Sequence, residues 1–121
     1  MYAPSKEIIF LPLIVAFDSQ ELRSICEYND IAIEKLGEHV ADLLHHRLSD
    51  IFAAETVADL LVGNPQKIGE HPYLNYVVTI SNSIKMEFCS NVTKKSYLEN
   101  GELDWSKVTR IKLLKIGYSN E

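Results

Sequence analysis

The period of the apolar residues changes once along the chain, from a helical period to a strand period. Between residues 18 and 54 apolar side chains recur every three or four positions, which is typical of helices that bury one face. From residue 76 onward apolar and polar side chains alternate, which is typical of strands in a half-buried sheet. The pattern therefore predicts helices in the first half of the chain and a sheet in the second half.

A first helix is predicted from Asp18 to Gly37. Asp18-Ser-Gln-Glu21 has the pattern of a capping box, in which Asp18 accepts from a first-turn amide and Glu21 reaches back. Gly37 suits the helix end, because a residue without a Cβ adopts the left-handed conformation at no steric cost. Tyr28-Asn29-Asp30 interrupts the helical spacing, so we expect an irregularity at these residues.

A second helix is predicted from about Glu38 to Ala54, and a short link makes the two helices a hairpin. Thr56 to Leu61 adds one more helical turn, which Gly63-Asn64-Pro65 closes. The exposed faces of the hairpin hold most of the acidic residues. Its apolar stripe consists of Val40, Leu43, Leu44, Leu48 and Ile51.

Three strands are predicted in the second half of the chain. Tyr76–Ser81 and Ile84–Ser90 are β-rich runs on either side of Asn82-Ser83, which together predict a hairpin. Val108–Tyr118 is the last strand, and its alternation slips at Leu113-Leu114. A β-bulge inserts one extra residue and would reconcile the two phases.

The order of the elements predicts an α+β fold in one domain. An N-terminal strand precedes the helices, and the connecting segments 64–75 and 94–101 are interpreted as loops. Helices followed by a run of antiparallel strands pack as one layer on one face of the sheet. A chain of 121 residues has room for a single hydrophobic core, so residues 1–121 are expected to form one domain.

Charge is distributed unevenly over a chain whose net charge is −5. Residues 1–60 carry four basic and eleven acidic residues, a net charge of −7, whereas residues 61–121 carry eight basic and six acidic residues, a net charge of +2. Proteins that bind RNA normally have a strong basic footprint, because phosphate neutralisation drives their affinity. Here the positive charge is weak and lies in the C-terminal half.

The apolar run from Ile8 to Phe17 is the one stretch that resembles a targeting segment. It is ten residues long and contains Pro12, so it is too short to span a bilayer. It also lacks the basic start and the small-residue cleavage site of a signal peptide, since Glu7 cancels Lys6. A cytoplasmic location is therefore expected.

Histidines and cysteines do not predict a metal site or a cofactor. His39, His45 and His46 share one predicted helix, but no pair has the spacing i,i+4 that would let two ligands converge. Cys26 and Cys89 occupy apolar positions of a helix and a strand, so we expect two buried thiols that behave as small hydrophobic residues.

Basic residues concentrate near the last strand and in the loop before it. A basic patch with aromatic neighbours can bind RNA or an acidic partner. Lysines on a strand face also have a purely structural use, because they protect a sheet from pairing with another chain. Both interpretations remain open for the set formed by Lys94, Lys95, Tyr97, Lys107, Arg110, Lys112 and Lys115.

Four segments, in their order and spacing, resemble a known family from about Phe17 to Tyr118. They are ELRSICEYNDIAIEKLG, LLHHRLSDIFAAETVADLLVGNP, the strand pair and DWSKVTRIKLLKIGYS. VADLLVGNP and DWSKVTRIKLLKIG are the most specific parts. The chain is similar to the HigB-like killer branch of the RelE/ParE superfamily of bacterial toxins. Residues 1–12 would then be an N-terminal addition before the first strand of the family.

This resemblance implies a strand and a two-helix hairpin packed on a twisted antiparallel sheet of about four strands. Active members of the family cut mRNA on the ribosome without a metal or cofactor, using the 2′-hydroxyl of the RNA as the nucleophile. Such a reaction needs a base, cations for the developing phosphorane charge and an acid for the leaving group. A cognate helix-turn-helix antitoxin normally neutralises the toxin.

The resemblance implies Tyr118, Lys85 and His71 as candidate catalytic residues. The family ends in Asp-Tyr-His, of which only the tyrosine is retained here, and Lys85 replaces an arginine. Lysine keeps the charge but loses the bidentate phosphate geometry. Gln66 stands where a histidine is common, so His71 or Lys67 would have to substitute. The candidate residues for RNA or partner binding are Arg110, Lys112, Lys94, Lys95 and Lys67.

Two hypotheses follow from these replacements. The first is a toxin that inhibits translation by cleaving mRNA on the ribosome. The second is a catalytically degenerate protein with the same fold that binds an antitoxin, gyrase or the ribosome without cleavage, as the ParE branch does with gyrase. Losing one general acid–base role costs about 10²–10⁴-fold in rate, so several losses together would leave little nuclease activity. The first hypothesis holds if the site is still active, and the second is the alternative.

Overall fold

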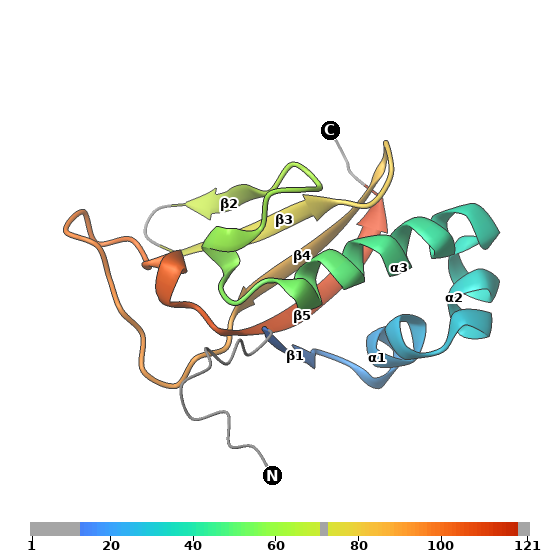
Figure 1. Cartoon of the computed structure of the whole chain (residues 1–121), viewed down its shortest axis with the longest axis horizontal. Helices are drawn as coiled ribbons and strands as arrows, with labels where there is room; N and C mark the ends of the chain where they lie inside the picture. Colours follow the sequence, from blue (N-terminus) through green and yellow to red (C-terminus); the bar gives the residue numbers. More distant parts are fainter. Residues whose placement is uncertain (1–12, 71–72, 119–121) are drawn as a thin grey trace, which may run out of the picture.

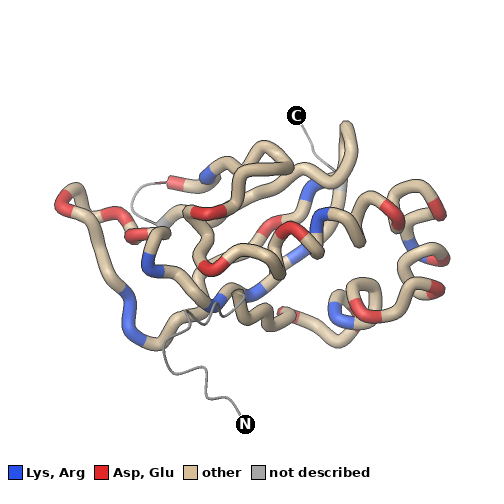
Figure 2. Tube along the Cα trace, in the orientation of Figure 1, with Lys and Arg blue, Asp and Glu red and all other residues tan. Residues whose placement is uncertain are grey.

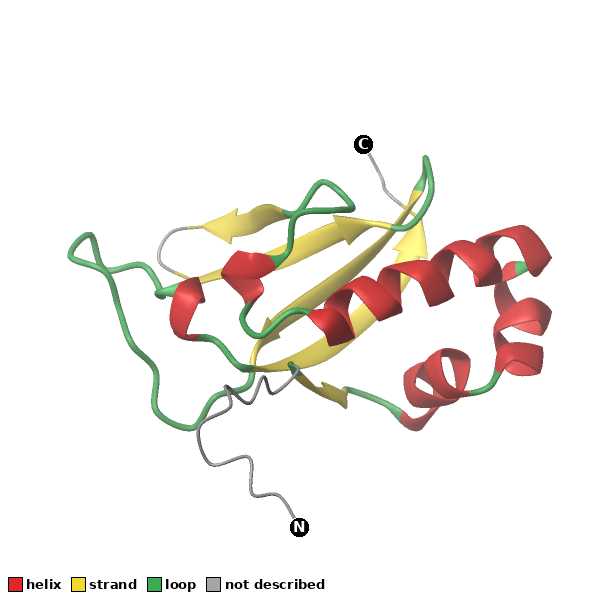
Figure 3. Cartoon of the chain, in the orientation of Figure 1, coloured by secondary structure: helices red, strands yellow, loops and turns green. Residues whose placement is uncertain are grey.

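A computed structural model describes residues 13–70 and 73–118 of the chain. Three α-helices form one layer and a five-stranded sheet forms the other, with two short 3₁₀ helices at one end (Figures 1 and 3). The helices are α1 (Gln20–Glu27), α2 (Asn29–Leu36), α3 (Glu38–Ala53), η1 (Val57–Asp59) and η2 (Trp105–Lys107). The strands are β1 (Ile14–Phe17), β2 (Gln66–Glu70), β3 (Tyr73–Thr79), β4 (Ile84–Ser90) and β5 (Arg110–Tyr118). The prediction of an α+β fold is confirmed.

The sheet has the strand order β1-β5-β4-β3-β2 and is mixed. β2, β3, β4 and β5 pair antiparallel along the chain, whereas β1 pairs parallel with β5. The expectation of about four antiparallel strands is therefore wrong in strand number and in sheet type. β2 was interpreted as a loop because all five of its side chains are exposed, so an edge strand of this kind shows no apolar alternation.

The predicted β-bulge in the last strand is confirmed. Met86 pairs with Ile116 and Glu87 with Lys115, but Phe88 pairs with Leu113, which leaves Leu114 without a partner. One extra residue in β5 brings the apolar positions on both sides of Leu114 onto the same face of the sheet.

The expectation of a two-helix hairpin is wrong, because the structure has three α-helices. The first predicted helix is divided into α1 and α2 at Tyr28, whose φ of −122° and ψ of 115° are extended. Its N-cap is Ser19, whose hydroxyl accepts from the Leu22 amide at 3.2 Å, so the assignment of the cap to Asp18 was wrong. The amide of Asp18 donates to the Leu113 carbonyl at 2.9 Å, which ties this residue to the end of the sheet. Because Asp18 is bonded to β5, the helix is capped one residue later, by Ser19.

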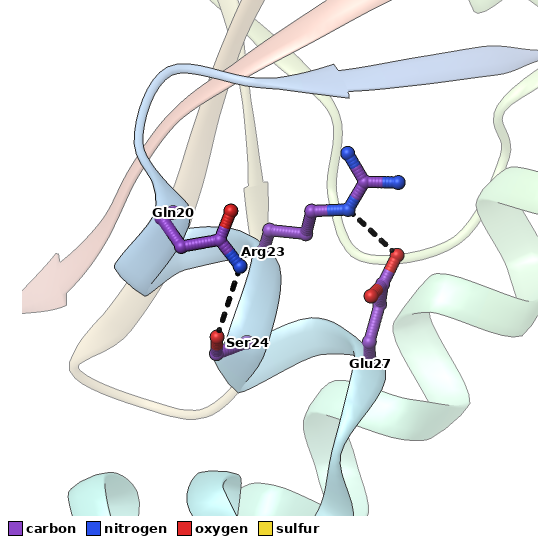
Figure 4. A network of polar contacts seen from close by, with 4 residues as sticks. All are labelled: Gln20, Arg23, Ser24 and Glu27. Atoms are coloured by element: carbon purple, nitrogen blue, oxygen red, sulfur yellow. Dashed lines mark hydrogen bonds and ion pairs between the residues drawn. The ribbon is translucent and has the colours of Figure 1, made fainter.

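Pairs of residues four positions apart stabilise α1 on its exposed side (Figure 4). The Arg23 guanidinium lies 2.9 Å from the Glu27 carboxylate, and the Gln20 amide donates to the Ser24 hydroxyl at 3.5 Å. Such pairs contribute a few tenths of a kcal/mol each to a helix, about 0.2–0.5 kcal/mol. Packing of Ile25 into the core therefore contributes more to the position of α1.

The core lies between the helices and one face of the sheet. Phe88 is fully buried at its centre, and Tyr76 stacks on it with ring centroids 6.0 Å apart. Trp105 of η2 closes the end of the core by an edge contact with Tyr76 at 4.6 Å between centroids. All three α-helices contribute to this core, with Ile25, Ala32, Ala41, Leu44, Leu48 and Ile51.

The remaining expectations concern the termini and the cysteines. The N-terminal addition, residues 1–12, lies outside the described residues. Cys26 and Cys89 are free thiols and are half-buried, less covered than expected. Within residues 13–70 and 73–118, no helix combines the length and the apolar character needed to cross a bilayer.

Candidate binding face of the sheet

The face of the sheet opposite the helices carries a row of cations. Along β4, Lys85 and Glu87 alternate with Ile84, Met86 and Phe88, which are buried against the helices. Because successive strand residues point to opposite faces, Lys85 and Glu87 belong to the far side of the sheet. We call this side the outer face, defined by Lys85, Glu87 and Cys89 of β4, Arg110, Lys112 and Lys115 of β5, and Ile14 and Ala16 of β1.

The register places four of these cations on two adjacent strands. Lys85 is opposite Gly117, and Lys115 is opposite Glu87. Lys112 lies between Cys89 of β4 and Ala16 of β1, and Arg110 is opposite Ile14. Neighbouring strands are about 4.8 Å apart, so the cations form a band along β5 and its neighbour. Figure 2 shows basic residues along β5.

Two carboxylates partly neutralise the outer face. Glu87 is only 18% exposed, accepts from the Asn75 amide at 3.0 Å and lies 3.8 Å from the Lys115 ammonium. Asp18 lies 3.7 Å from the Lys112 ammonium. Both ion pairs are long, and pairs of this kind near the surface contribute about 0–1 kcal/mol. Four cations and two carboxylates leave a net charge of +2 on this face, in a chain of net charge −5.

Lys85 and Arg110 form no ion pair with another described residue, so their charges remain available to a ligand. Arg110 is exposed at the start of β5, and its carbonyl accepts from the Asn91 amide at 2.8 Å. Lys85 is half-buried in the middle of the sheet. The outer face therefore holds two uncommitted cations and two that are weakly paired.

The structure places three of the predicted residues on the outer face, namely Lys85, Arg110 and Lys112. Lys85 is opposite Gly117, so it lies at the other end of β5 from Arg110. Tyr118 is the last residue of β5 and is paired with Ile84, one register position from Lys85 and Gly117. His71 lies outside the described residues, so the candidate catalytic set is placed only in part.

The other predicted cations lie away from this band. Lys67 is on the edge strand β2, opposite Tyr76 of the core face, and its ammonium lies 3.5 Å from the Glu102 carboxylate. Lys94 and Lys95 are exposed in the loop after β4, where the Lys95 ammonium donates to the Val92 carbonyl at 3.0 Å. The binding set predicted from the sequence is therefore divided between separate surfaces.

Sequence reasoning did not identify the partners that set the charge of the outer face. Asn75 was placed in a loop, but it belongs to β3 and fixes the Glu87 carboxylate. Glu87 lies between two buried residues, Met86 and Phe88, so its alternation was visible in the sequence. What the sequence did not contain was the pairing of Glu87 with Lys115 on the neighbouring strand.

The outer face carries charged side chains, but none of the described histidines, which could act as a general acid or base, lies on it. His39, His45 and His46 all belong to α3, in the helical layer. Two side chains away from the outer face have shifted pKa values: burial raises the pKa of the Cys26 thiol to about 12, and the Ser106 hydroxyl lowers the pKa of Asp104. No three His, Cys, Asp or Glu side chains gather into a metal site within the described ranges.

A band of cations on an open sheet face suits the phosphates of a nucleic-acid strand or the carboxylates of an acidic segment. The described side chains can attract and position an anionic ligand, since lysine and arginine are protonated at neutral pH. Comparison with protein-family models, with curated proteins and with solved structures finds no match to this chain.

Proposed function

We propose that this protein is the toxin component of a toxin–antitoxin pair of the RelE/HigB-like type, and that it acts by binding RNA on the outer face of its sheet. The observation that carries the proposal is the band formed by Lys85, Arg110, Lys112 and Lys115 on the face that the described helices leave uncovered. Release of counterions from phosphates favours binding at such a band. The net charge of the whole chain opposes it, so the affinity is moderate and depends strongly on salt.

Binding without cleavage is the form of the proposal that the described residues favour. Cleavage through a 2′-hydroxyl needs a base and an acid near the reacting phosphate. Among the described side chains on or beside the outer face, the ionisable groups are lysines, one arginine, Cys89 and the carboxylates of Glu87 and Asp18. Glu87 already accepts from Asn75, and Asp18 lies beside Lys112 at the end of the band. Lys85 gives charge without the bidentate geometry of arginine. A nuclease would have to rely on His71 and Tyr118.

Binding is tested with the purified full chain and a fluorescein-labelled single-stranded RNA, by anisotropy at several salt concentrations. We expect Lys85→Ala and Lys112→Ala each to weaken binding and to reduce the salt slope by about 0.7 per lysine. Lys35→Ala is the matched control, because Lys35 is an exposed lysine on α2 that already pairs with Glu21 at 3.6 Å. An equal loss in the control, or no RNA binding by the native chain, contradicts the proposal.

Cleavage is tested separately by induced expression and primer extension on cellular mRNAs. If the protein acts by binding, growth slows, no codon-specific cuts appear, and Tyr118→Ala has no effect on growth. Codon-specific cuts that disappear in Tyr118→Ala would instead establish the nuclease. The proposed system also predicts a neighbouring gene for a helix-turn-helix antitoxin, and coexpression of that partner is expected to restore growth.

A further inference from the structure

Two consecutive apolar side chains are exposed where the chain leaves η1. Leu61 is 85% exposed and Val62 is 47% exposed. Leu61 and Val62 belong to the segment VADLLVGNP, whose Val57 and Leu60 are buried. Folding of the domain therefore uses the first half of this segment and leaves the second half in water. Contiguous exposed apolar residues of this kind mark interaction sites more often than chance exposure does.

The chain is fixed on both sides of Leu61 and Val62. Before them, the Thr56 hydroxyl and amide both contact the Asp59 carboxylate at 3.2 Å, which closes a capping box around η1. After them, the Gly63 carbonyl accepts from the Thr79 amide at 2.7 Å, which joins this turn to the end of β3. The exposure of Leu61 is consequently a property of a defined turn.

A hollow of about 390 Å³ lies beside these side chains, between the end of α3 and the turn. Its wall is apolar where Ala53, Leu61 and Val62 line it, and acidic where Asp50, Glu55 and Asp59 line it. None of the residues lining this hollow is basic. We call it the α3–η1 groove, defined by these six residues.

The charge around the α3–η1 groove is negative for a second reason. α3 is 16 residues long and ends here without a basic residue in its last turn. The carbonyl end of a helix carries a partial negative charge, which a cation normally complements. Arg47 is the nearest cation on α3, but its guanidinium is held by the Asp50 carboxylate at 2.7 Å and the Thr79 carbonyl at 2.9 Å. Glu55 and Asp59 therefore have no cation to balance them among the lining residues.

We propose that the α3–η1 groove docks a cationic amphipathic helix of a partner protein. Apolar side chains of that helix cover Leu61 and Val62, and its lysines or arginines lie against Glu55 and Asp59. The acidic rim selects this occupant, because an apolar segment without charge leaves the carboxylates unbalanced and an acidic segment is repelled. α3 and η1, which carry the groove, lie on one side of the sheet (Figure 1). The cation band is on the opposite, outer face, so docking leaves the proposed RNA-binding face free.

The proposal is tested on the full chain with a synthetic amphipathic peptide of about 18 residues, five helical turns, built from leucine, alanine and lysine. Binding is followed by ¹⁵N-resolved NMR, which reports the amides that shift. We expect the amides of Leu61, Val62 and Ala53 to shift. The dissociation constant of the peptide should rise about tenfold or more for Leu61→Ser and for Glu55→Lys. Tyr97→Ser is the matched control, since Tyr97 is 61% exposed in the distant loop, and it is expected to bind within twofold of the native chain.

The same peptide with glutamate in place of lysine is expected not to bind. Equal binding of the two peptides, an unchanged affinity in Leu61→Ser, or shifts confined to the outer face overturns the proposal. Two further occupants are distinguishable. Sedimentation that shows a dimer abolished by Leu61→Ser assigns the groove to a second copy of the chain. Shifts at Leu61 in the full chain carrying Ile8→Ser, without any peptide, assign it to the N-terminal residues. Either result also overturns the proposal, and neither bears on RNA binding by the outer face.

Discussion

Gly63→Ala is the substitution whose effect follows most directly from the structure. Gly63 has a φ of +83°, and a Cβ at this position would lie 2.8 Å from both Cδ and Nε of Arg47. Carbon atoms attract optimally at about 3.5–4.0 Å, so the Arg47 side chain has to move. That side chain donates to the Thr79 carbonyl at 2.9 Å, and Thr79 in turn donates to Gly63 at 2.7 Å. The substitution therefore disturbs the contact that holds α3, the turn and β3 together.

Two contributions set the loss of unfolding free energy in Gly63→Ala. A residue with a Cβ in the left-handed region costs about 1–2 kcal/mol. Loss of the hydrogen bond from Arg47 to the Thr79 carbonyl costs about 0.5–1.5 kcal/mol, with more if the carbonyl is left unsatisfied. We therefore expect Gly63→Ala to lower the free energy of unfolding by about 1.5–3.5 kcal/mol.

Urea unfolding followed by circular dichroism measures this loss, and the chain offers two controls. Gly37 also has a positive φ, +88°, but a Cβ there would meet nothing within 4 Å. Gly37 has a ψ of 158°, in a region that glycine alone adopts readily, so Gly37→Ala should lose a backbone contribution of about 1–3 kcal/mol without any loss from a clash. In an Arg47→Ala background, Gly63→Ala should lose only its own backbone contribution, about 1–2 kcal/mol. The reasoning is refuted if the substitutions at Gly63 and Arg47 are additive.

Three further predictions concern the core and the shifted side chains. Phe88 is fully buried, so Phe88→Ala should lower the unfolding free energy by about 3–5 kcal/mol, and a loss below about 1 kcal/mol in urea titration contradicts the assigned core. The Ser106 hydroxyl lowers the pKa of Asp104 below 3.8, so the stability it provides is present above that pH and is lost as the pH falls through the folded-state pKa. The unfolding free energy of Asp104→Asn should thus fall less steeply below about pH 4 than that of the native chain. The same dependence on pH in both proteins would contradict a contribution of Asp104 to stability. Burial raises the pKa of the Cys26 thiol from 9.0 to about 12, so iodoacetamide should modify it about a thousandfold more slowly in the folded chain than in urea, and equal rates by mass spectrometry would exclude this burial.

The helical elements show where local pattern sufficed. The spacing of apolar residues predicted α3 within one residue of its observed end, because an amphipathic helix buries every third or fourth side chain. Gly37 was placed correctly at a helix end because its positive φ of 88° favours a residue without a Cβ. The division at Tyr28 appeared only as an irregularity in the sequence. In the structure α1 contacts β1 and β5 whereas α2 packs on α3, and the sequence does not specify that packing.

The sheet and the candidate site show where local pattern was insufficient. The alternation along β4 and β5 determined which residues share a face, and the slip at Leu114 determined the bulge. The alternation could not reveal β2, whose five residues are all exposed and show no alternation of apolar and polar side chains. Nor could it reveal the parallel pairing of β1 with β5. Strand pairing joins residues far apart in the chain, so its direction and order depend on the packing of the whole molecule.

The sequence by itself determined the α+β fold, the helix that begins at Glu38 and the concentration of cations in the last strand. Only the tertiary structure decided that Lys85, Arg110 and Lys112 share the face away from the helices, while Lys67, Lys94 and Lys95 lie elsewhere. It also decided that Leu61 and Val62 remain in water although Leu60 is buried. The physical reason is that periodicity reports which side chains lie on the same side of one element. Which side is covered depends on the neighbouring elements that pack against it.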